Sequence, residues 1–222
     1  MVADDLRRNA PWADVCVVDD ASTDDTTRVA RELGLETLRL PVNLGIGGAV
    51  QTGYLAARRR DYDIAVQFDG DGQHDASSLD QLLDPIRAGQ ADMVIGSRFL
   101  GDGTFRSTSS RRLGIRYLSW IAHLRCGVSI ADVTSGYRAA GRRSIELFSR
   151  YYPADYPEPE VVALASRAGL RVLEVPARMR ERAHGASTIT VGRSLYYLVK
   201  VSLALLLLPT RRDRRTPLES TR

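Results

Sequence analysis

The sequence predicts an α/β fold, in which an open, mostly parallel sheet is flanked by helices. Short apolar runs alternate with segments of helical spacing from the start of the chain, as in successive βαβ units. Two of these runs end in carboxylates, and the composition, with 44% hydrophobic and 26% charged residues, is that of a globular domain. At 222 residues the chain has room for one such domain with appendages.

Five segments are expected to form strands. The two clearest are Asp14–Asp19 (DVCVVD) and Asp63–Asp69 (DIAVQFD), and the shorter ones are Glu36–Leu40, Asp92–Gly96 and Leu170–Val175. The loops at the carboxyl ends of strands in an open α/β sheet form the usual ligand crevice. Ligand-binding residues are therefore expected directly after these strands.

Helices are expected between and after the strands. Apolar residues recur at helical spacing in five segments: Asp24–Leu33, Gly47–Arg59, Ser77–Ala88, Arg111–Cys126 and Pro159–Ala168. Ser22 and Ser77 are the expected N-caps of the first and third of these helices.

Two carboxylates, Asp69 and Asp71, follow the second strong strand in the sequence FDGDGQHD. Carboxylates one residue apart, with glycines between and after them, suit a hard divalent cation that also binds phosphate oxygens. An EF-hand loop would need glycine where His74 stands, and a DxDxT phosphatase motif would need threonine where Gln73 stands. For this motif alone, a solvated turn is the alternative.

The first strand ends in VVDDASTDDT, where Asp19 and Asp20 can accept hydrogen bonds from a nucleobase or ribose. The segment NLGIGGAVQTGY places Asn43 and Gly48 at a strand-to-helix turn, where backbone N–H groups can face an anion. A dinucleotide-binding fingerprint would need a small residue at Val50, and a phosphate-binding loop would need a lysine followed by serine or threonine. Neither pattern is present.

These three motifs, together with GSRF at 96–99 and DVTSGYRA at 132–139, have an order and spacing that resemble the family 2 glycosyltransferases of GT-A fold. The most similar branch contains dolichol-phosphate mannose synthase and bacterial polyprenyl-phosphate glycosyltransferases. Each motif alone is weak, but five in register over about 14–190 are specific. The resemblance implies a Rossmann-like sheet and an inverting, metal-dependent transfer of a sugar from a nucleotide diphosphate sugar.

The resemblance also implies roles for the carboxylates. Asp19 and Asp20 look like the pair that contacts the nucleoside. Asp69 and Asp71 look like the ligands of Mg²⁺ or Mn²⁺ and the diphosphate, and Gln73 matches a further position near the metal.

Catalytic roles are implied for a second group of residues. Asp132 and Arg138, with Ser135 and Gly136 between them, match the segment beside the donor sugar and acceptor. The stretch RMRERAHGAST, with Arg180, Arg182, Gly185 and Ser187, matches a basic loop near an acceptor phosphate. Surface arginines with no role in catalysis are the alternative.

The charged groups of these loops favour a polyprenyl phosphate as the acceptor. A lipid phosphate is already an anionic nucleophile and needs positive charge to hold it, whereas a hydroxyl acceptor needs a general base. The loops offer several arginines and few unpaired carboxylates. Asp132, Glu158 and Glu160 remain candidates for a base.

The last apolar run, Leu195–Leu208, is shorter than the roughly 20 residues of a membrane span. Tyr196 and Tyr197 stand at its start and RRDRR at Arg211–Arg215 follows it, which is typical of an interfacial helix with a basic anchor. We therefore expect contact with a membrane surface through 194–215. A core helix with a solvated tail is the alternative.

The expected organisation is a glycosyltransferase domain over 1–193, an apolar helix over 194–209 and a disordered basic tail over 210–222. The formal charge is +4, and the body shows no basic stripe with interleaved aromatics, so nucleic acid is not an expected partner. The two cysteines stand apart in apolar stretches, which fits a reducing cytoplasm. The expected location is the cytoplasm, peripheral to the membrane's cytoplasmic face.

One departure from the family lies at the start of the chain. Family members begin with a strand ending in a Pro-x-Tyr-Asn-Glu-like segment, and here the chain opens at what resembles the following helix. The first strand is thus expected to be missing, either because the true start lies upstream or because the chain is a reduced form. A nucleotide-sugar binding module without turnover, and a phosphohydrolase using the same carboxylates, are the alternative functions.

Overall fold

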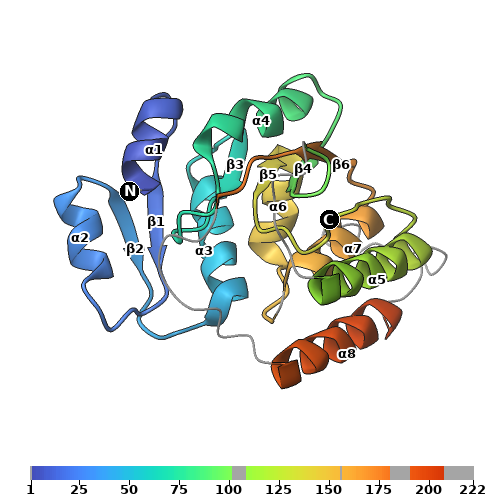
Figure 1. The fold of residues 1–222 in the computed structure, drawn as a ribbon. Helices are drawn as coiled ribbons and strands as arrows, with labels where there is room; N and C mark the ends of the chain where they lie inside the picture. The colour runs from blue at the N-terminus through green and yellow to red at the C-terminus, as the bar shows by residue number, and fades with distance from the viewer. Residues whose placement is uncertain (1, 102–108, 156, 181–190, 208–222) are drawn as a thin grey trace, which may run out of the picture.

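The computed structural model describes residues 2–101, 109–155, 157–180 and 191–207 (Figure 1). Helices and strands alternate over most of this chain, as predicted. In order they are α1 (Val2–Asn9), β1 (Cys16–Asp19), α2 (Thr26–Glu32), β2 (Glu36–Arg39), α3 (Gly45–Arg59), β3 (Ile64–Gln67), the short 3-10 helix η1 (Ala76–Ser78), α4 (Leu79–Arg87), β4 (Met93–Ser97), α5 (Ser109–Cys126), β5 (Arg138–Gly141), α6 (Arg142–Arg150), α7 (Pro157–Arg167), β6 (Val172–Pro176) and α8 (Val191–Leu207).

The strands form two sheets in the described part of the chain. β1 and β2 pair in parallel, and the second sheet has the order β3-β5-β4-β6, in which β4 and β6 are parallel and β5 runs antiparallel to both its neighbours. β1 and β3 therefore each keep one edge without a strand partner. Helix α3 packs against both of them and links the two sheets (Figure 1).

Apolar residues pack on both faces of the larger sheet. Met93 and Ile95 of β4 belong to a core cluster with Phe148 and Val162, whereas Val94, between them, belongs to a second cluster with α4. This alternation is that of a strand buried on both faces. β4 and β5 are buried throughout, while β1 and β3 are only half-buried over most of their length.

Two predicted helix caps are wrong. Ser22 does not cap α2; its backbone N–H donates to Asp19, while Asp24 accepts from Thr26 at the helix start. Ser77, the expected cap of the third helix, does not cap it either. Its backbone N–H donates to the Asp75 carboxylate at 3.0 Å, so Asp75 is the capping residue. At the two helix starts the carboxylate of an aspartate, Asp24 or Asp75, accepts the N–H bond instead, since a carboxylate accepts these bonds at least as well as a serine hydroxyl.

The structure adds two elements to the prediction, β5 and α6. β5 has the sequence RAAG and is fully buried, although it lacks the aliphatic and β-branched residues by which a strand is normally recognised. Contacts on both sides, with β3 and β4, make it a strand.

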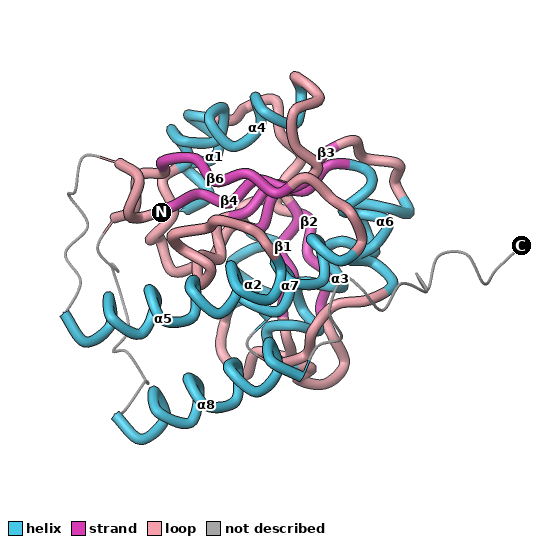
Figure 2. The backbone as a smooth tube through the Cα atoms, turned by 90° about the vertical axis from the view of Figure 1, so that its right-hand side faces the viewer, coloured by secondary structure: helices cyan, strands magenta, loops and turns pink. Residues whose placement is uncertain are grey.

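The apolar run near the end of the chain is helical, as α8. Val201 and Leu205 are buried in the larger core cluster, and the helix packs beside α5 and α7 (Figure 2). The basic tail over 210–222 lies outside the described residues. Among the helices that the structure describes, none is both long and apolar enough to cross a membrane.

Candidate active site

The carboxyl end of β3 presents the first part of the site. Asp69 follows the strand, and its backbone N–H donates to Nδ1 of His74 at 3.0 Å. The proton of the neutral imidazole is therefore on Nε2, which lies 3.5 Å from Oδ2 of Asp69. Burial lowers the pKa of His74, although Asp69 and Asp71 act to raise it. A neutral histidine thus orients the Asp69 carboxylate.

His74 is a positioning residue that the sequence reasoning did not select. The ring is almost fully buried, stacks on Tyr137 with centroids 4.5 Å apart, and meets the edge of Phe68. Aromatic neighbours fix the imidazole plane. The signal in the sequence was its place in FDGDGQHD, five residues after Asp69.

The loop after Asp69 is held by its own backbone and by Arg180. Oδ1 of Asp71 accepts from the N–H of Gln73 at 3.0 Å, and the carbonyl of Gln73 accepts from the N–H of Arg180 at 2.8 Å. The Arg180 guanidinium contacts Asp5 at 3.0 Å and Asp75 at 2.9 Å, and the hydrogen bond to Asp5 raises its pKa. Arg180 therefore lies beside the carboxylate loop, with its charge engaged by two acids.

The oxygen atoms of Asp69 and Asp71 fit a hard cation shared with an anionic ligand. The Asp69 side chain is 39% exposed, and Asp71 is half-buried. Within the described ranges, no group of three or more His, Cys, Asp or Glu side chains is arranged to hold a metal ion. The protein thus offers two carboxylates, and oxygens of a bound diphosphate would complete the coordination.

Gly136 brings the segment 132–138 against Asp69. A Cβ at Gly136 would lie 3.1 Å from Oδ2 of Asp69 and 3.2 Å from Nε2 of Gln67. Only glycine allows the backbone to approach the carboxylate without displacing these side chains. The segment of Asp69, predicted to bind the metal, therefore contacts the segment of Gly136, predicted to lie beside the acceptor.

Asp132, predicted to lie beside the donor sugar and acceptor, is buried within this segment. It is fully buried and forms a bidentate ion pair with Arg98, with bonds of 2.7 Å to Nε and 2.6 Å to Nη2. Thr134 donates to the same carboxylate, at 3.1 Å. Asp132 therefore positions Arg98, whose signal in the sequence was the GSRF motif.

Arg138 is also fully buried, and its bonds go to the protein backbone. Nε donates to the carbonyl of Ser135 at 2.7 Å, and Nη2 donates to the carbonyls of Val133 at 3.0 Å and Glu158 at 2.7 Å. These bonds hold the segment 132–138 in its path against α7.

Two buried nitrogens on paired residues of β3 and β5 lack a hydrogen-bond partner among the described residues. They are Nη1 of Arg138 and Nε2 of Gln67, two residues that face each other in the β3–β5 register. Glu158 lies close by, and burial raises its pKa while the charge of Arg138 opposes that shift. Unsatisfied buried donors are costly, so this part of the site suits an oxygen-rich ligand.

The end of β1 is joined to the start of α3. Asp19 is buried and accepts from the N–H of Ser22 at 2.8 Å and from the hydroxyl of Thr27, and these bonds, led by those from Ser22, lower its pKa to about 2. Oδ1 of Asp20 accepts from the N–H of Leu44 at 2.7 Å. Both carboxylates stabilise this turn.

The turn before α3 uses most of its backbone donors internally. Asn43 accepts from the N–H of Gly45 at 3.1 Å and donates to the carbonyl of Asp20 at 3.3 Å. The N–H of Gly47 donates to the carbonyl of Ala154 at 3.2 Å. Gly48 leaves space for Leu44, because a Cβ at Gly48 would lie 2.4 Å from that of Leu44. Asn43 and Gly48 thus shape this turn.

Some predicted residues are not placed. Arg182, Gly185 and Ser187 lie outside the described residues, as does RRDRR at Arg211–Arg215.

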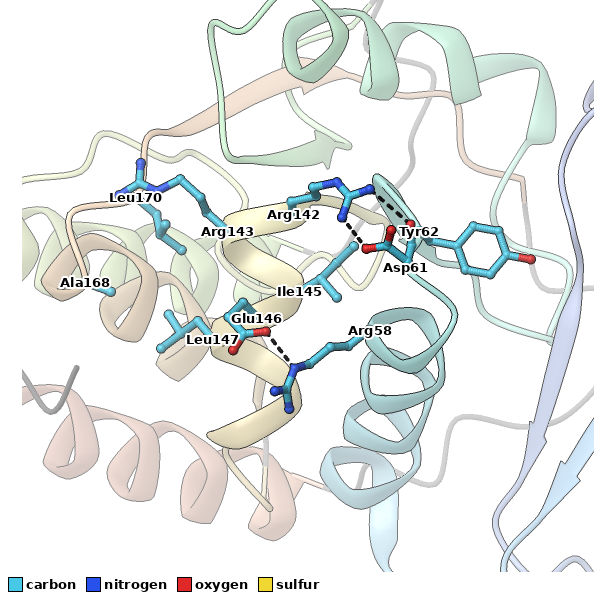
Figure 3. A pocket seen from close by; sticks show the side chains of 10 residues that line it. All are labelled: Arg58, Asp61, Tyr62, Arg142, Arg143, Ile145, Glu146, Leu147, Ala168 and Leu170. Carbon is cyan, nitrogen blue, oxygen red and sulfur yellow. Dashed lines mark hydrogen bonds and ion pairs between the residues drawn. The ribbon is translucent and has the colours of Figure 1, made fainter. Parts of the chain in front are cut away.

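A separate pocket lies between α6 and the end of α3 and has a volume of about 510 Å³ (Figure 3). Its arginines are paired: Arg58 contacts Glu146 at 2.6 Å, and Arg142 contacts Asp61 and lies 2.6 Å from Asp63. No residue predicted for the site lines this pocket. It is therefore distinct from the candidate active site.

Comparison with known proteins agrees with the predicted fold and family. The family model described as glycosyl transferase family 2 matches residues 4–148. Undecaprenyl-phosphate mannosyltransferase of Micrococcus luteus is 34% identical over 199 aligned positions, covering 84% of this chain and 80% of that protein. Polyprenol monophosphomannose synthase of Mycolicibacterium smegmatis is 33% identical, covering 86% of this chain and 76% of that protein.

Among solved structures, glucosyl-3-phosphoglycerate synthase from Mycobacterium tuberculosis, in complex with Mn²⁺, UDP and phosphoglyceric acid, superposes with a TM-score of 0.71. Its identity is 21%, and the match covers 94% of this chain and 74% of that chain. The chain therefore belongs to glycosyl transferase family 2 and has a GT-A fold.

Proposed function

We propose that this protein transfers a sugar from a nucleotide diphosphate sugar to a polyprenyl phosphate, with inversion at the anomeric carbon. One observation carries the proposal: across Gly136, the carboxylates that suit a cation and diphosphate lie against the segment that carries Asp132 and Arg138. The likeness to an undecaprenyl-phosphate mannosyltransferase and a polyprenol monophosphomannose synthase supports the substrate classes.

Asp69 and Asp71 would hold Mg²⁺ or Mn²⁺ together with the donor diphosphate. When bound, the cation would neutralise the negative charge that develops on the leaving diphosphate. His74 keeps the Asp69 carboxylate oriented, and the carbonyl of Gln73 is already engaged by Arg180. Asp19 and Asp20, at the end of β1, would contact the nucleoside.

The acceptor phosphate supplies the nucleophile. One of its oxygens forms the new bond to the anomeric carbon from the face opposite the diphosphate, while the bond from that carbon to the diphosphate breaks. The nucleoside diphosphate leaves with the electron pair. No proton is removed from the acceptor, because a phosphate monoester is already anionic near neutral pH.

The charges needed to hold such an acceptor come from two arginines. The guanidinium of Arg98 is fixed by Asp132, and Arg138 directs Nη1 into the buried region beside Gln67 and Glu158. Both act electrostatically on Glu158, so they lie in one region. Fixed donors of this kind bind an oxyanion without reorganisation.

A pair of matched acceptors tests the proposal. The protein is incubated with a panel of labelled nucleotide sugars and either a polyprenyl phosphate or the polyprenol of the same length, with Mn²⁺, with Mg²⁺ or with EDTA. We expect transfer to the phosphate alone, and only with a divalent cation. Equal transfer to the polyprenol would contradict the phosphate acceptor and would favour Glu158 as the base of a hydroxyl acceptor, given its raised pKa.

A further inference from the structure

Helix α5 exposes an apolar stripe that the sequence analysis did not identify. Leu113, Tyr117, Trp120 and Leu124 are all exposed, and Trp120 is 59% accessible. Their spacing places them within one narrow sector of the helix. The opposite side of α5, with Leu118 and neighbouring residues, is buried in the core cluster.

Helix α8 exposes a stripe of the same kind. Tyr196, Val199, Leu203 and Leu206 recur at intervals of three and four residues and are exposed, while Val201 and Leu205 are buried.

The two helices lie side by side in the same direction on the outside of the molecule (Figure 1, Figure 2). Near their starts, a Cβ at Gly114 would lie 3.5 Å from a methyl group of Leu198. Near their ends, Arg125 donates to the carbonyl of Leu206 at 2.7 Å.

These contacts place the two stripes on one face. Each residue of a helix is rotated by about 100° about the helix axis from the one before it. Gly114 and Arg125 therefore both lie on the same side of the α5 stripe, roughly a quarter to a third of a turn away from it. Leu198 lies a similar angle to the opposite side of the α8 stripe. For parallel helices in contact, opposite offsets turn both stripes toward the same side. The result is one continuous apolar surface, the α5–α8 face.

The two helices of the α5–α8 face carry no acidic side chain of their own. Neither contains an aspartate or glutamate, Arg116 is exposed beside the α5 stripe, and Lys200 of α8 pairs with Asp155 at 2.5 Å. Tyrosine and tryptophan within an apolar band that has arginine or lysine beside it are the residues that occupy the boundary between lipid headgroups and acyl chains.

We infer that the α5–α8 face docks on an anionic lipid surface, with α5 and α8 lying in the plane of the headgroups. The inference deepens the proposed function, because it states how the chain reaches a membrane-borne acceptor. Ser119 of α5 donates to the carbonyl of Ala131 at 3.0 Å, next to Asp132, and the Tyr197 side chain of α8 interacts electrostatically with Glu158. The two helices therefore border the acceptor end of the site.

The chain has only two tryptophans, which makes the inference directly testable. Trp12 is 55% exposed, close to the value of Trp120, but it follows α1 and contacts Arg87. In Trp12→Phe the only tryptophan is Trp120, and in Trp120→Phe it is Trp12. We expect vesicles of phosphatidylcholine and phosphatidylglycerol to shift the emission of Trp120 to the blue and to leave that of Trp12 unchanged. Vesicles of phosphatidylcholine alone should give a smaller shift, and added salt should weaken binding.

Vesicle sedimentation provides the second measurement, with Trp12→Ser as the matched control. Trp120→Ser should weaken binding to the anionic vesicles at least about tenfold, because a large apolar side chain no longer enters the bilayer boundary. Trp12→Ser should bind like the unaltered protein. Circular dichroism checks that both variants are folded.

Three results would overturn the inference. The first is Trp120 emission that vesicles do not alter, and the second is equal vesicle binding by Trp120→Ser and Trp12→Ser. The third is a shift of Trp120 emission with rising protein concentration in the absence of lipid, which would make the face a contact between copies of the chain. None of these measurements uses donor or acceptor. Transfer to a detergent-solubilised acceptor tests the proposed function separately and should be unchanged in Trp120→Ser.

Discussion

At the scale of single residues, the Asp71 carboxylate carries the proposed metal chemistry. Asp71→Asn keeps the size of the side chain and an oxygen for the N–H of Gln73, but it removes the negative charge that a cation needs. We expect the fold to remain and metal-dependent transfer to fall by about 100-fold or more. Asp80→Asn, which changes an exposed aspartate of α4, should retain activity. Unchanged turnover in Asp71→Asn, or full activity in EDTA, would exclude this metal mechanism.

Another aspartate, Asp92, makes stability depend on pH. It is buried at the start of β4, and hydrogen bonds from Arg171, at 2.8 Å from the backbone N–H and 3.0 Å from Nε, lower its pKa from 3.8 to about 2. Because the unfolded chain binds the proton more readily, this contribution of about 2 kcal/mol is present above about pH 5 and is lost as the pH falls toward 2.

Urea unfolding of Asp92→Asn tests this dependence. The variant should be less stable than the unaltered protein at pH 7 and pH 5 by a similar amount, and the difference should shrink at pH 3. A difference that stays constant over this range would show that Asp92 titrates normally in the folded protein.

At the scale of elements, substitution by alanine should have opposite effects on stability at two of the glycines of helix α3. A Cβ at Gly47 would lie 2.1 Å from the carbonyl oxygen of Pro153, so Gly47→Ala forces the loop away and should destabilise the protein by more than about 1 kcal/mol. At Gly53 the nearest atom would be 3.8 Å away, and Gly53→Ala should stabilise the helix by up to about 1 kcal/mol. Thermal unfolding measures both, and equal shifts would contradict the close approach of α3 and the 153–154 loop.

The free edges of β1 and β3 are the second feature at this scale. In the part of the chain that the structure describes, each presents backbone groups without a strand partner, and a buried unpaired group costs ~1–3 kcal/mol. An apolar strand with the first half of a helix, about 15 to 20 residues fused ahead of Met1, should raise the melting temperature and tighten nucleotide-sugar binding. A glycine-serine extension of the same length is the control. Equal effects of the two extensions would show that the edges of β1 and β3 do not take up a strand.

Sequence reasoning reached the elements with local patterns and missed those made by distant contacts. Asp69 and Asp71 were predictable because they follow an apolar run, and a carboxylate pair at a strand end is a local signal. The burial of Asp132 was not predictable, because it depends on an ion pair with Arg98, which lies 34 residues away in the sequence. β5 was not predicted, because its small residues form a strand only between β3 and β4. The role of His74 was not predicted, because it depends on how the loop folds back on Asp69.

At the scale of the whole molecule, the site draws on both sheets. Asp19 and Asp20 follow β1 of the smaller sheet, whereas Asp69 and Asp71 follow β3 of the larger one, and α3 joins the two. Under the proposed function, the acceptor phosphate binds beside Arg98 and Arg138, next to α7 and near α5 and α8. The proposal thus places a soluble donor and a lipid acceptor at opposite ends of one site.

The most direct test of the account is mass spectrometry of the lipid extracted after the full chain is incubated with a nucleotide-sugar panel, Mn²⁺ and a polyprenyl phosphate. The account predicts a lipid heavier by one sugar residue, with one nucleoside diphosphate released for each lipid formed. Release of nucleoside diphosphate with free sugar and an unchanged lipid, or binding of the donor without any release, would contradict it.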